Sequence, residues 1–495
     1  MDNHIISEQG MFQFDTSYAR LPHPFYTRVS PAQVPKPELI TFNSDLARQL
    51  GAQDTNQSDT QLAEIFSGQR LLPGSEPIAM AYAGHQFGNF VPQLGDGRAL
   101  LLGEVVGPAG HRFDIQLKGS GRTPFSRNGD GKAPLGPVLR EYIVSEALHH
   151  LGMPTTRSLA AVKTGETVRR ETPLPGAILT RVASSHIRIG TFEYFAFKQD
   201  VDNLKRLTEY SIQRHYPEIQ NDPQADLHFF RNVGQTQVEL VTGWMALGFI
   251  HGVMNTDNMS IAGESIDFGP CAFMDQFRFD QVFSSIDQFG RYNYSNQAQI
   301  TLWNLSRFGN CLLLLHQDIS EDELRKWNQE LEALQDLFEH RHTIKMLEKL
   351  GIFDYERPND RELIQKWLRY LEAEHLDYTL SFRALAPLVD QEAGWGAFKK
   401  TEAFQEFYNL WQERLHQQDL EVTAIQERMN QVNPVFIPRN HKIEEVIEAG
   451  RRGDFSPFHE MNEVLQTPFH EQEGRSSYRA APRPEEMVQA TFCGT

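Results

Sequence analysis

The sequence predicts an α+β fold, in which a β-containing first part is followed by a mainly helical second part and a helical extension. Residues 88–119 contain a glycine turn, an apolar stretch and, at residues 112–118, an alternation of polar and apolar positions that is typical of a strand. From residue 201 onward, long amphipathic stretches with helical spacing dominate. The composition is that of a globular protein, with 40% hydrophobic and 23% charged residues. A chain of 495 residues is long enough for two to four structural units.

The first part contains a predicted β-hairpin with a glycine-rich tip. A glycine segment at residues 93–99 leads into an apolar stretch, residues 108–111 form a turn, and residues 112–118 alternate as a strand does. The polar, glycine-rich residues 119–134 predict a long loop.

A helix is predicted from Pro137 to His150, because proline suits a first helical turn and Gly152 can end the helix. Two strands are expected after it, near Ser158–Lys163 and Gly176–Val182. Upstream, the turn-rich residues 11–75 contain one candidate helix near Asp45–Leu50.

In the second part, helices are predicted around residues 233–250, 297–317, 320–350, 360–375 and 401–430. The last 45 or so residues lose this periodicity. We therefore expect four segments, which are an N-terminal extension (1–80), a small β-containing lobe (81–195), a helical lobe (196–345), and a helical C-terminal extension with a tail (346–495).

The charge balance narrows the range of partners. Lys and Arg total 47 against 65 Asp and Glu, which gives a net charge of −18. Such a chain repels nucleic acid and anionic membranes, so we expect neither as a partner. Three scattered cysteines argue against a disulfide framework, and we find no signal peptide or membrane-spanning apolar run. We expect a cytoplasmic protein.

The segment from His251 to Asp267 carries the strongest chemical signal. In kinase-like phosphotransferases, a loop of the form H-x-D-x-x-x-x-N is followed by a short hairpin and D-F-G, and the Asn and second Asp hold Mg²⁺. His251 and Asn258 keep this interval, residues 259–266 are long enough for a tight hairpin, and Asp267 begins D-F-G. We therefore expect a protein-kinase-like bilobal fold with a metal site at Asn258 and Asp267.

The catalytic base of a kinase is missing from this segment. Its position is occupied by Val253, which cannot accept a proton. The only free carboxylate in the loop is that of Asp257. The alternative interpretation, that these are ordinary turn residues, would be preferred for D-F-G alone but not for the whole pattern.

Phosphate-binding candidates lie upstream. Gly95 and Gly97 would let backbone N–H groups approach a phosphate, and Arg98 adds a fixed charge, although hairpin turns also need glycine. Lys118 ends the next strand, where a kinase has its phosphate-pairing lysine. Two carboxylates of the following helix could orient this lysine, those of Glu141 and Glu146.

The loop after Lys118 is unusually cationic for an acidic protein. Together with two downstream arginines it offers bidentate phosphate contacts, although a single arginine is more often a surface residue. The residues concerned are Arg122, Arg127, Asp130, Lys132, Arg181 and Arg188. His85 has no second histidine at metal-ligand spacing, so we expect it to be a structural hydrogen-bonding residue.

Several blocks in the same order resemble the selenoprotein O (SelO/YdiU) family of kinase-like protein adenylyltransferases. The resemblance runs almost from end to end. The blocks are Phe14–Pro22, Tyr82–Gly88, Pro92–Leu101, Gln116–Arg127, Leu139–Tyr142, His251–Ile261 and Asn433–His441.

The resemblance implies transfer of AMP from ATP to Ser, Thr or Tyr hydroxyls of protein substrates, with ATP inverted relative to kinases so that the γ-phosphate is buried. It implies these roles: glycine-loop contacts from Gly95, Gly97 and Arg98; a phosphate-pairing Lys118 oriented by Glu141; binding of the inverted phosphate tail by Asp130, Gly131, Arg181 and Arg188; Mg²⁺ or Mn²⁺ binding by Asn258 and Asp267; and a catalytic base, Asp257. Burial of a polyphosphate requires several cations, which this loop and the arginine pair can supply.

The resemblance also raises the question of redox control. Some family members carry a redox-active Cys near the C-terminus, paired with a Cys after D-F-G. Cys493 matches the first, but residues 282–286, where the partner is expected, contain no cysteine. Cys271 is an alternative partner, and a free tail thiol is the other interpretation.

Two further hypotheses compete with AMP transfer. One is an unconventional protein kinase that uses Asp257 as its base, and the other is a catalytically inactive nucleotide-binding scaffold. The absence of the kinase Asp argues against the kinase. The metal pair and the cationic loop argue against the scaffold, which needs neither.

Overall fold

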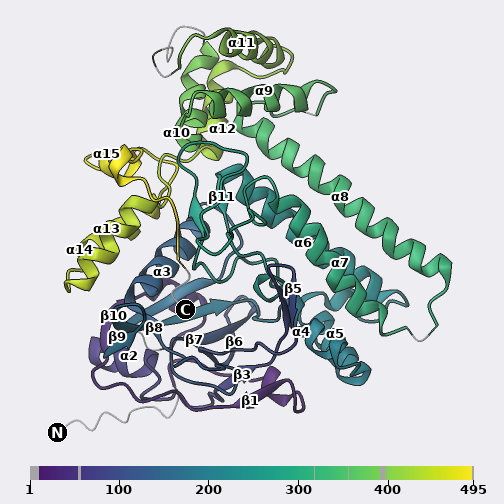
Figure 1. Ribbon diagram of the computed structural model, residues 1–495, viewed down its shortest axis with the longest axis vertical. Helices are drawn as coiled ribbons and strands as arrows, with labels where there is room; N and C mark the ends of the chain where they lie inside the picture. The colour runs from purple at the N-terminus through teal and green to yellow at the C-terminus, as the bar shows by residue number, and fades with distance from the viewer. Residues whose placement is uncertain are drawn as a thin grey trace.

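The computed structural model describes residues 10–53, 57–316, 318–354, 356–390, 396 and 398–492. Its first part is built on an eight-stranded antiparallel sheet (Figure 1). The strands, in spatial order, are β1 (Tyr26–Arg28), β3 (Ile78–Met80), β6 (Ala99–Val106), β7 (Arg112–Lys118), β10 (Pro173–Ala183), β9 (Arg157–Arg169) and β2 (Glu38–Phe42), with β8 (Ala133–Pro134) paired to β10.

Both faces of this sheet are buried, because alternate side chains of its central strands point to opposite sides. On β10, Ile178 and Val182 pack against α1 (Ser44–Gln49) and α2 (Asp59–Phe66) with the N-terminal segment. Leu179 points to the other face, which is covered by α3 (Leu135–His150). Each fully buried Leu or Ile contributes about 1.5–3 kcal/mol, so this two-sided core fixes the strand register.

The predicted hairpin, the helix ending at His150 and the two later strands are confirmed, with longer strands than expected. The turn predicted at residues 108–111 is confirmed, and the hairpin tip contains Gly107 and Gly110. The β6–β7 turn lies at residues 107–111, where Gly107 donates to the His111 carbonyl. Gly95 and Gly97 precede β6, in the connection from β3 that carries the small hairpin of β4 (Gly84–Gln86) and β5 (Asn89–Val91).

The second part is helical, as predicted. Its helices are α4 (Ile189–Phe197), α5 (Val201–His215), α6 (Ala225–Leu247), α7 (Gln297–Leu313) and α8 (Glu321–Lys349). The helix predicted to end near residue 250 ends earlier, because Gly248 adopts the left-handed conformation and caps it. Residues 249–250 then form β11, which pairs with β12 (Ala272–Phe273).

The hairpin predicted for residues 259–266 does not form as a paired unit. Its turn exists, since Gly263 donates to the Ser260 carbonyl. Its two arms pair elsewhere, Ser260 with Arg188 and Ser265 with Thr155. Residues 259–266 are therefore fixed by pairing with the residues just before β9 and just before α4, and not with each other.

The C-terminal extension contains α9 (Asp360–Ala373), α10 (Tyr378–Leu385), α11 (Glu402–Leu415), α12 (Val422–Val432), α13 (Asn440–Arg451), α14 (Ser456–Leu465) and α15 (Ser476–Arg479). The single helix expected over 401–430 is broken at residues 416–421. Although the last 45 or so residues lose helical periodicity in the sequence, α14 forms there and packs with α13 on α3 (Figure 1). Within the described residues, no helix combines the length and the apolar composition that crossing a membrane requires.

Candidate active site

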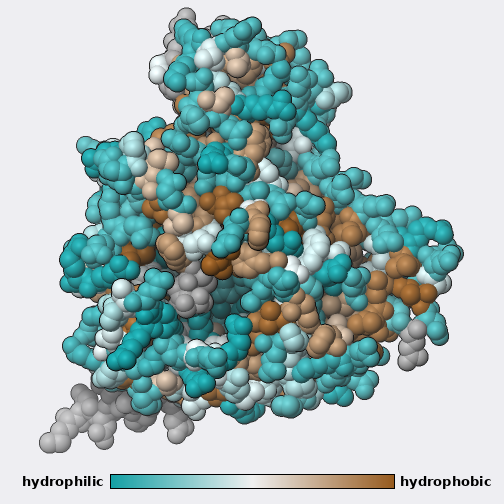
Figure 2. Space-filling view, in the orientation of Figure 1, coloured by the Kyte–Doolittle hydropathy of each residue, from teal (hydrophilic) through white to brown (hydrophobic). Residues whose placement is uncertain are grey.

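A cavity of about 710 Å³ opens between the sheet and the helical part. Figure 2 shows this face hollowed near its middle, with brown, hydrophobic side chains on the rim. The cavity is lined by eleven of the twelve predicted site residues: Gly95, Gly97, Arg98, Lys118, Asp130, Gly131, Arg181, Arg188, Asp257, Asn258 and Asp267. The twelfth, Glu141, contacts the cavity through Lys118.

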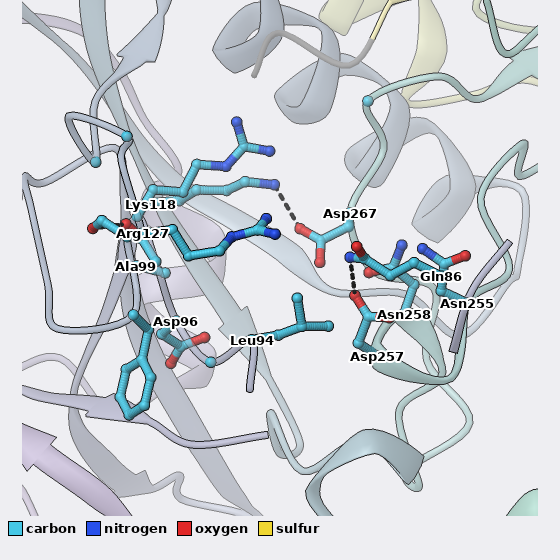
Figure 3. A pocket seen from close by; sticks show the side chains of 18 of the residues that line it. Gln86, Leu94, Asp96, Ala99, Lys118, Arg127, Asn255, Asp257, Asn258 and Asp267 are labelled. Atoms are coloured by element: carbon cyan, nitrogen blue, oxygen red, sulfur yellow. Dashed lines mark hydrogen bonds and ion pairs between the residues drawn. The ribbon is translucent and has the colours of Figure 1, made fainter. Parts of the chain in front are cut away.

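Lys118 lies between two carboxylates. Its Nζ donates to Glu141 Oε2 at 2.6 Å and to Asp267 Oδ1 at 2.6 Å, and Figure 3 shows the side chain directed at Asp267. Of the two candidate partners from the sequence, only Glu141 makes this contact. Glu146 instead accepts from Arg157 and Asn43. The two glutamates are five residues apart, about 140° around the helix, so they face different neighbours.

The two predicted arginines are buried at the same point. Arg181 Nη1 lies 2.8 Å from Asp267 Oδ1 and 3.3 Å from Glu141 Oε1. Arg188 Nη1 lies 3.1 Å from Asp267 Oδ2 and donates to the Asp257 carbonyl at 2.8 Å. The Arg188 guanidinium also stacks 4.5 Å from the centre of the Tyr82 ring.

Three cations thus converge on the Asp267 carboxylate. Although burial opposes ionisation, Lys118 and the two arginines hold the pKa of Asp267 well below its usual range. Asp267 also has a left-handed backbone, with φ 65°, which Asp tolerates better than most residues. The carboxylate is therefore ionised and fixed in direction.

Asp257 lies on the same side of the cavity as Asp267 and Asn258, on a short 3₁₀ turn formed by Thr256–Asn258 (Figure 3). Its side chain is buried, Oδ2 accepts a long 3.4 Å hydrogen bond from Gln86, and Oδ1 has no hydrogen-bond partner. Burial raises the pKa of Asp257 to about 6, despite the opposing charge of Arg188. A carboxylate with this pKa and an unpaired oxygen suits proton transfer near neutral pH.

A hydrogen-bond network that the sequence did not reveal supports the turn that carries Asp257. Glu193, on α4, accepts from Thr256 Oγ1 and lies 2.6 Å from His85 Nδ1. The His85 backbone N–H in turn donates to Thr256 Oγ1 at 2.7 Å. His85 is therefore the structural hydrogen-bonding residue that we expected, and Glu193 is the partner that we missed.

The glycine segment packs closely against the loop after β7. A Cβ on Gly95 (φ 82°) would lie 2.4 Å from the Phe125 ring, and one on Gly97 would lie 2.9 Å from the Phe125 carbonyl oxygen. Asp96, between these glycines, was also missed. Its buried carboxylate accepts from the Met80 N–H, and burial raises its pKa to about 6.

The cationic loop after β7 lines the outer part of the cavity, and its Asp130 pairs with an arginine from another turn. Asp130 is bound by Arg170 at 3.0 and 3.1 Å and accepts from the Lys132 N–H, which lowers its pKa. Gly131 adopts φ 70°, and a Cβ there would meet the Gly121 carbonyl oxygen at 2.0 Å. These two residues shape the loop at the cavity wall, and Arg170 is an additional cation from the β9–β10 turn.

The fit of a divalent metal depends on Asn258 and Asp267. Both supply hard oxygen donors, which Mg²⁺ and Mn²⁺ prefer, and Asn258 is oriented by a 3.0 Å hydrogen bond from its Nδ2 to the Val253 carbonyl. Among the described residues, no group of three or more His, Cys, Asp or Glu side chains could hold a metal by itself. The pair therefore fits a Mg²⁺ whose other ligands are phosphate oxygens and water.

The cysteine prediction is tested only in part. Cys271 is buried, and burial raises the pKa of its thiol to about 12, so it carries almost no thiolate at neutral pH. Cys493 lies outside the described residues.

Matches to known proteins cover nearly the whole chain. A family model described as protein adenylyltransferase SelO matches residues 9–466. A protein nucleotidyltransferase YdiU of Nitrobacter winogradskyi is 52% identical over 486 residues, covering 97% of this chain and 96% of the relative. Proteins of the same name from Rhodopseudomonas palustris and Rhizobium etli are each 50% identical, cover 98% of this chain, and are themselves covered to 99% and 97%. The chain belongs to the SelO family of protein adenylyltransferases.

Proposed function

We propose that this enzyme transfers AMP from ATP to Ser, Thr or Tyr hydroxyls of protein substrates and releases pyrophosphate. The observation that carries the proposal is the pairing of Asp257, a buried carboxylate with a free oxygen, with a neighbouring cluster of buried cations, of which Arg188 binds the Asp257 carbonyl. The first suits a hydroxyl acceptor, and the second suits a polyphosphate.

We propose that ATP lies inverted relative to kinases, within a kinase-like arrangement of the β-containing lobe and the helical lobe. Lys118, Arg181 and Arg188 form the deepest charged part of the cavity, with exposed fractions of 7% or less. Burying three cations costs desolvation free energy, and direct ion pairs with a γ-phosphate bound there would offset part of that cost. The α-phosphorus is then left nearer the side of Asp257 and Val253.

The reaction follows from this orientation. Asp257 accepts the proton of the acceptor hydroxyl, and the oxygen attacks the α-phosphorus. The bond from that phosphorus to the oxygen bridging the α- and β-phosphates breaks, and pyrophosphate leaves with the bond electrons. Lys118 and the two arginines stabilise the charge that develops on the leaving group.

Asn258 and Asp267 would hold Mg²⁺ or Mn²⁺. When bound, the metal would neutralise phosphate charge and help fix the nucleotide. Gly95, Gly97 and Arg98 would cover the phosphates from the sheet side, and Glu141 would keep Lys118 directed at them.

Incubation with ATP labelled at the α- or the γ-phosphate tests the proposal. We expect label to enter protein only from the α position, and Asp257→Asn to abolish this transfer. Label entering from the γ position would instead identify a kinase. Nucleotide binding without transfer from either position would identify a scaffold.

A further inference from the structure

The loop that follows the D-F-G segment presents unusually exposed hydrophobic side chains. Phe289 is 96% exposed and Ile286 is 57% exposed. Full exposure of a phenylalanine leaves its hydrophobic surface in water, and nothing in the fold requires it at this position.

Ile286 also lines the catalytic cavity, together with Asp257 and Pro270. Any protein that delivers a hydroxyl to Asp257 must approach through the mouth of this cavity. The acceptor segment would therefore pass over Ile286 and the adjacent turn.

Hydrogen bonds fix the conformation of this loop. The Asp287 carboxylate accepts from the Arg291 N–H at 2.9 Å and from the Tyr292 N–H at 2.8 Å, which closes the turn. Tyr292 Oη then donates to Asn255 Oδ1 at 2.7 Å, next to the turn that carries Asp257. The exposed side chains are thus held in a fixed relation to the catalytic carboxylate.

The C-terminal segment adds a third hydrophobic side chain. Thr491 pairs in parallel with Ser284, donating its N–H to the Phe283 carbonyl at 2.7 Å and accepting from Ser285 at 3.1 Å. The next residue, Phe492, is 70% exposed. We call Ile286, Phe289 and Phe492 the apolar ledge.

The ledge is unsuited to the nucleotide. Its three members have purely hydrocarbon side chains, and the carboxylate of the turn, that of Asp287, is buried against backbone N–H groups. Its continuity with the cavity and its apolar character suit a flexible polypeptide with a hydrophobic side chain close to the acceptor hydroxyl.

We infer that the apolar ledge is the docking surface for the acceptor protein and selects a segment with an aliphatic or aromatic residue beside the modified Ser, Thr or Tyr. This inference rests on the proposed function and specifies its substrate class.

The test uses a peptide array in which one acceptor residue is flanked by Ala, Gly and Ser, and a single Leu is moved through about three positions on either side. Transfer is measured with α-labelled ATP. We expect the wild-type enzyme to prefer Leu at one or two positions. Ile286→Ser/Phe289→Ser should remove the preference and lower kcat/KM for the preferred peptide about 10-fold, the change expected from losing one buried apolar contact.

Leu410→Ser is the matched control, because Leu410 is a 40% exposed leucine on α11, in the C-terminal extension. It should leave both the preference and kcat/KM unchanged. The Kd for ATP should stay within about twofold in every variant, and thermal melting should verify that the double variant folds. Phe289→Ser alone provides a second, milder variant.

An unchanged preference and kcat/KM in the folded double variant would overturn the ledge while leaving AMP transfer intact. So would a wild-type dimer in sedimentation velocity that the double variant breaks, or vesicle binding that it abolishes, since either would assign the ledge another partner. If the wild-type enzyme transfers no α-label to any peptide or protein, the proposed function fails and the ledge proposal fails with it.

Discussion

Replacement of Asp257 by Asn should lower activity and raise stability at the same time. The carboxyl has a pKa of about 6 in the folded protein against 3.8 for an unperturbed Asp, so it binds its proton more tightly when folded. Above pH 6 the folded protein therefore carries an ionised carboxylate in an unfavourable site. This difference in pKa corresponds to about 3 kcal/mol of destabilisation.

Asn removes the charge but leaves the new amide poorly paired, which costs about 1–2 kcal/mol. Arg188 keeps its partner, because it binds the backbone carbonyl of residue 257 and not its side chain. The net gain is about 1–2 kcal/mol above pH 6. It should fade as the pH falls below 6 and be lost below pH 3.8, where the wild-type carboxyl is protonated in both states.

The assay combines kinetics with melting curves. Loss of a general base lowers kcat by roughly 10²–10⁴-fold. In the wild-type enzyme, kcat/KM should fall about tenfold per pH unit below pH 6. Asp96 has a pKa of about 6 in the same cavity, so Asp96→Asn is the control and should keep this acid limb. Retained activity in Asp257→Asn, or a lower melting temperature at pH 8, would refute the reasoning.

Three other substitutions test the surrounding geometry. Lys118→Ala leaves two buried carboxylates without their shared cation and should lower kcat/KM for ATP by roughly 10²–10³-fold in a steady-state assay. Gly95→Ala forces a Cβ into the Phe125 ring and should raise the KM for ATP, whereas Gly110→Ala, in the exposed β6–β7 turn, should not. Glu193→Gln weakens the support of the catalytic turn and should lower kcat about 10-fold with an unchanged Kd for ATP; an equal loss of nucleotide binding would contradict this role.

A site residue could be predicted when the pattern that identifies it lies within one short segment of the sequence. Asn258 and Asp267 were predictable because their spacing from His251 is a property of one short segment, and Lys118 because it ends an alternating strand. Glu193 was not, since its partners His85 and Thr256 are more than 60 residues away and meet it only after α4 packs.

The same limit applies to the fold. The amphipathic helices and the β6–β7 hairpin follow from short-range periodicity, and most of them were predicted close to their observed bounds. The arms of the segment 259–266 were assigned to each other because they are neighbours in sequence, whereas in the structure they pair with Arg188 and Thr155. Long-range pairing leaves no periodic trace in the sequence.

The convergence of Lys118, Arg181 and Arg188 has a consequence for the reverse reaction. Three cations face three carboxylates there, those of Glu141, Asp267 and Asp96, whose Oδ1 lies 3.8 Å from Arg188 Nη2. With ATP in the proposed orientation, the leaving pyrophosphate is formed in contact with these cations and must exit from the deepest point. Pyrophosphate should therefore be a strong product inhibitor, and at high concentration it should return AMP from a modified protein to ATP.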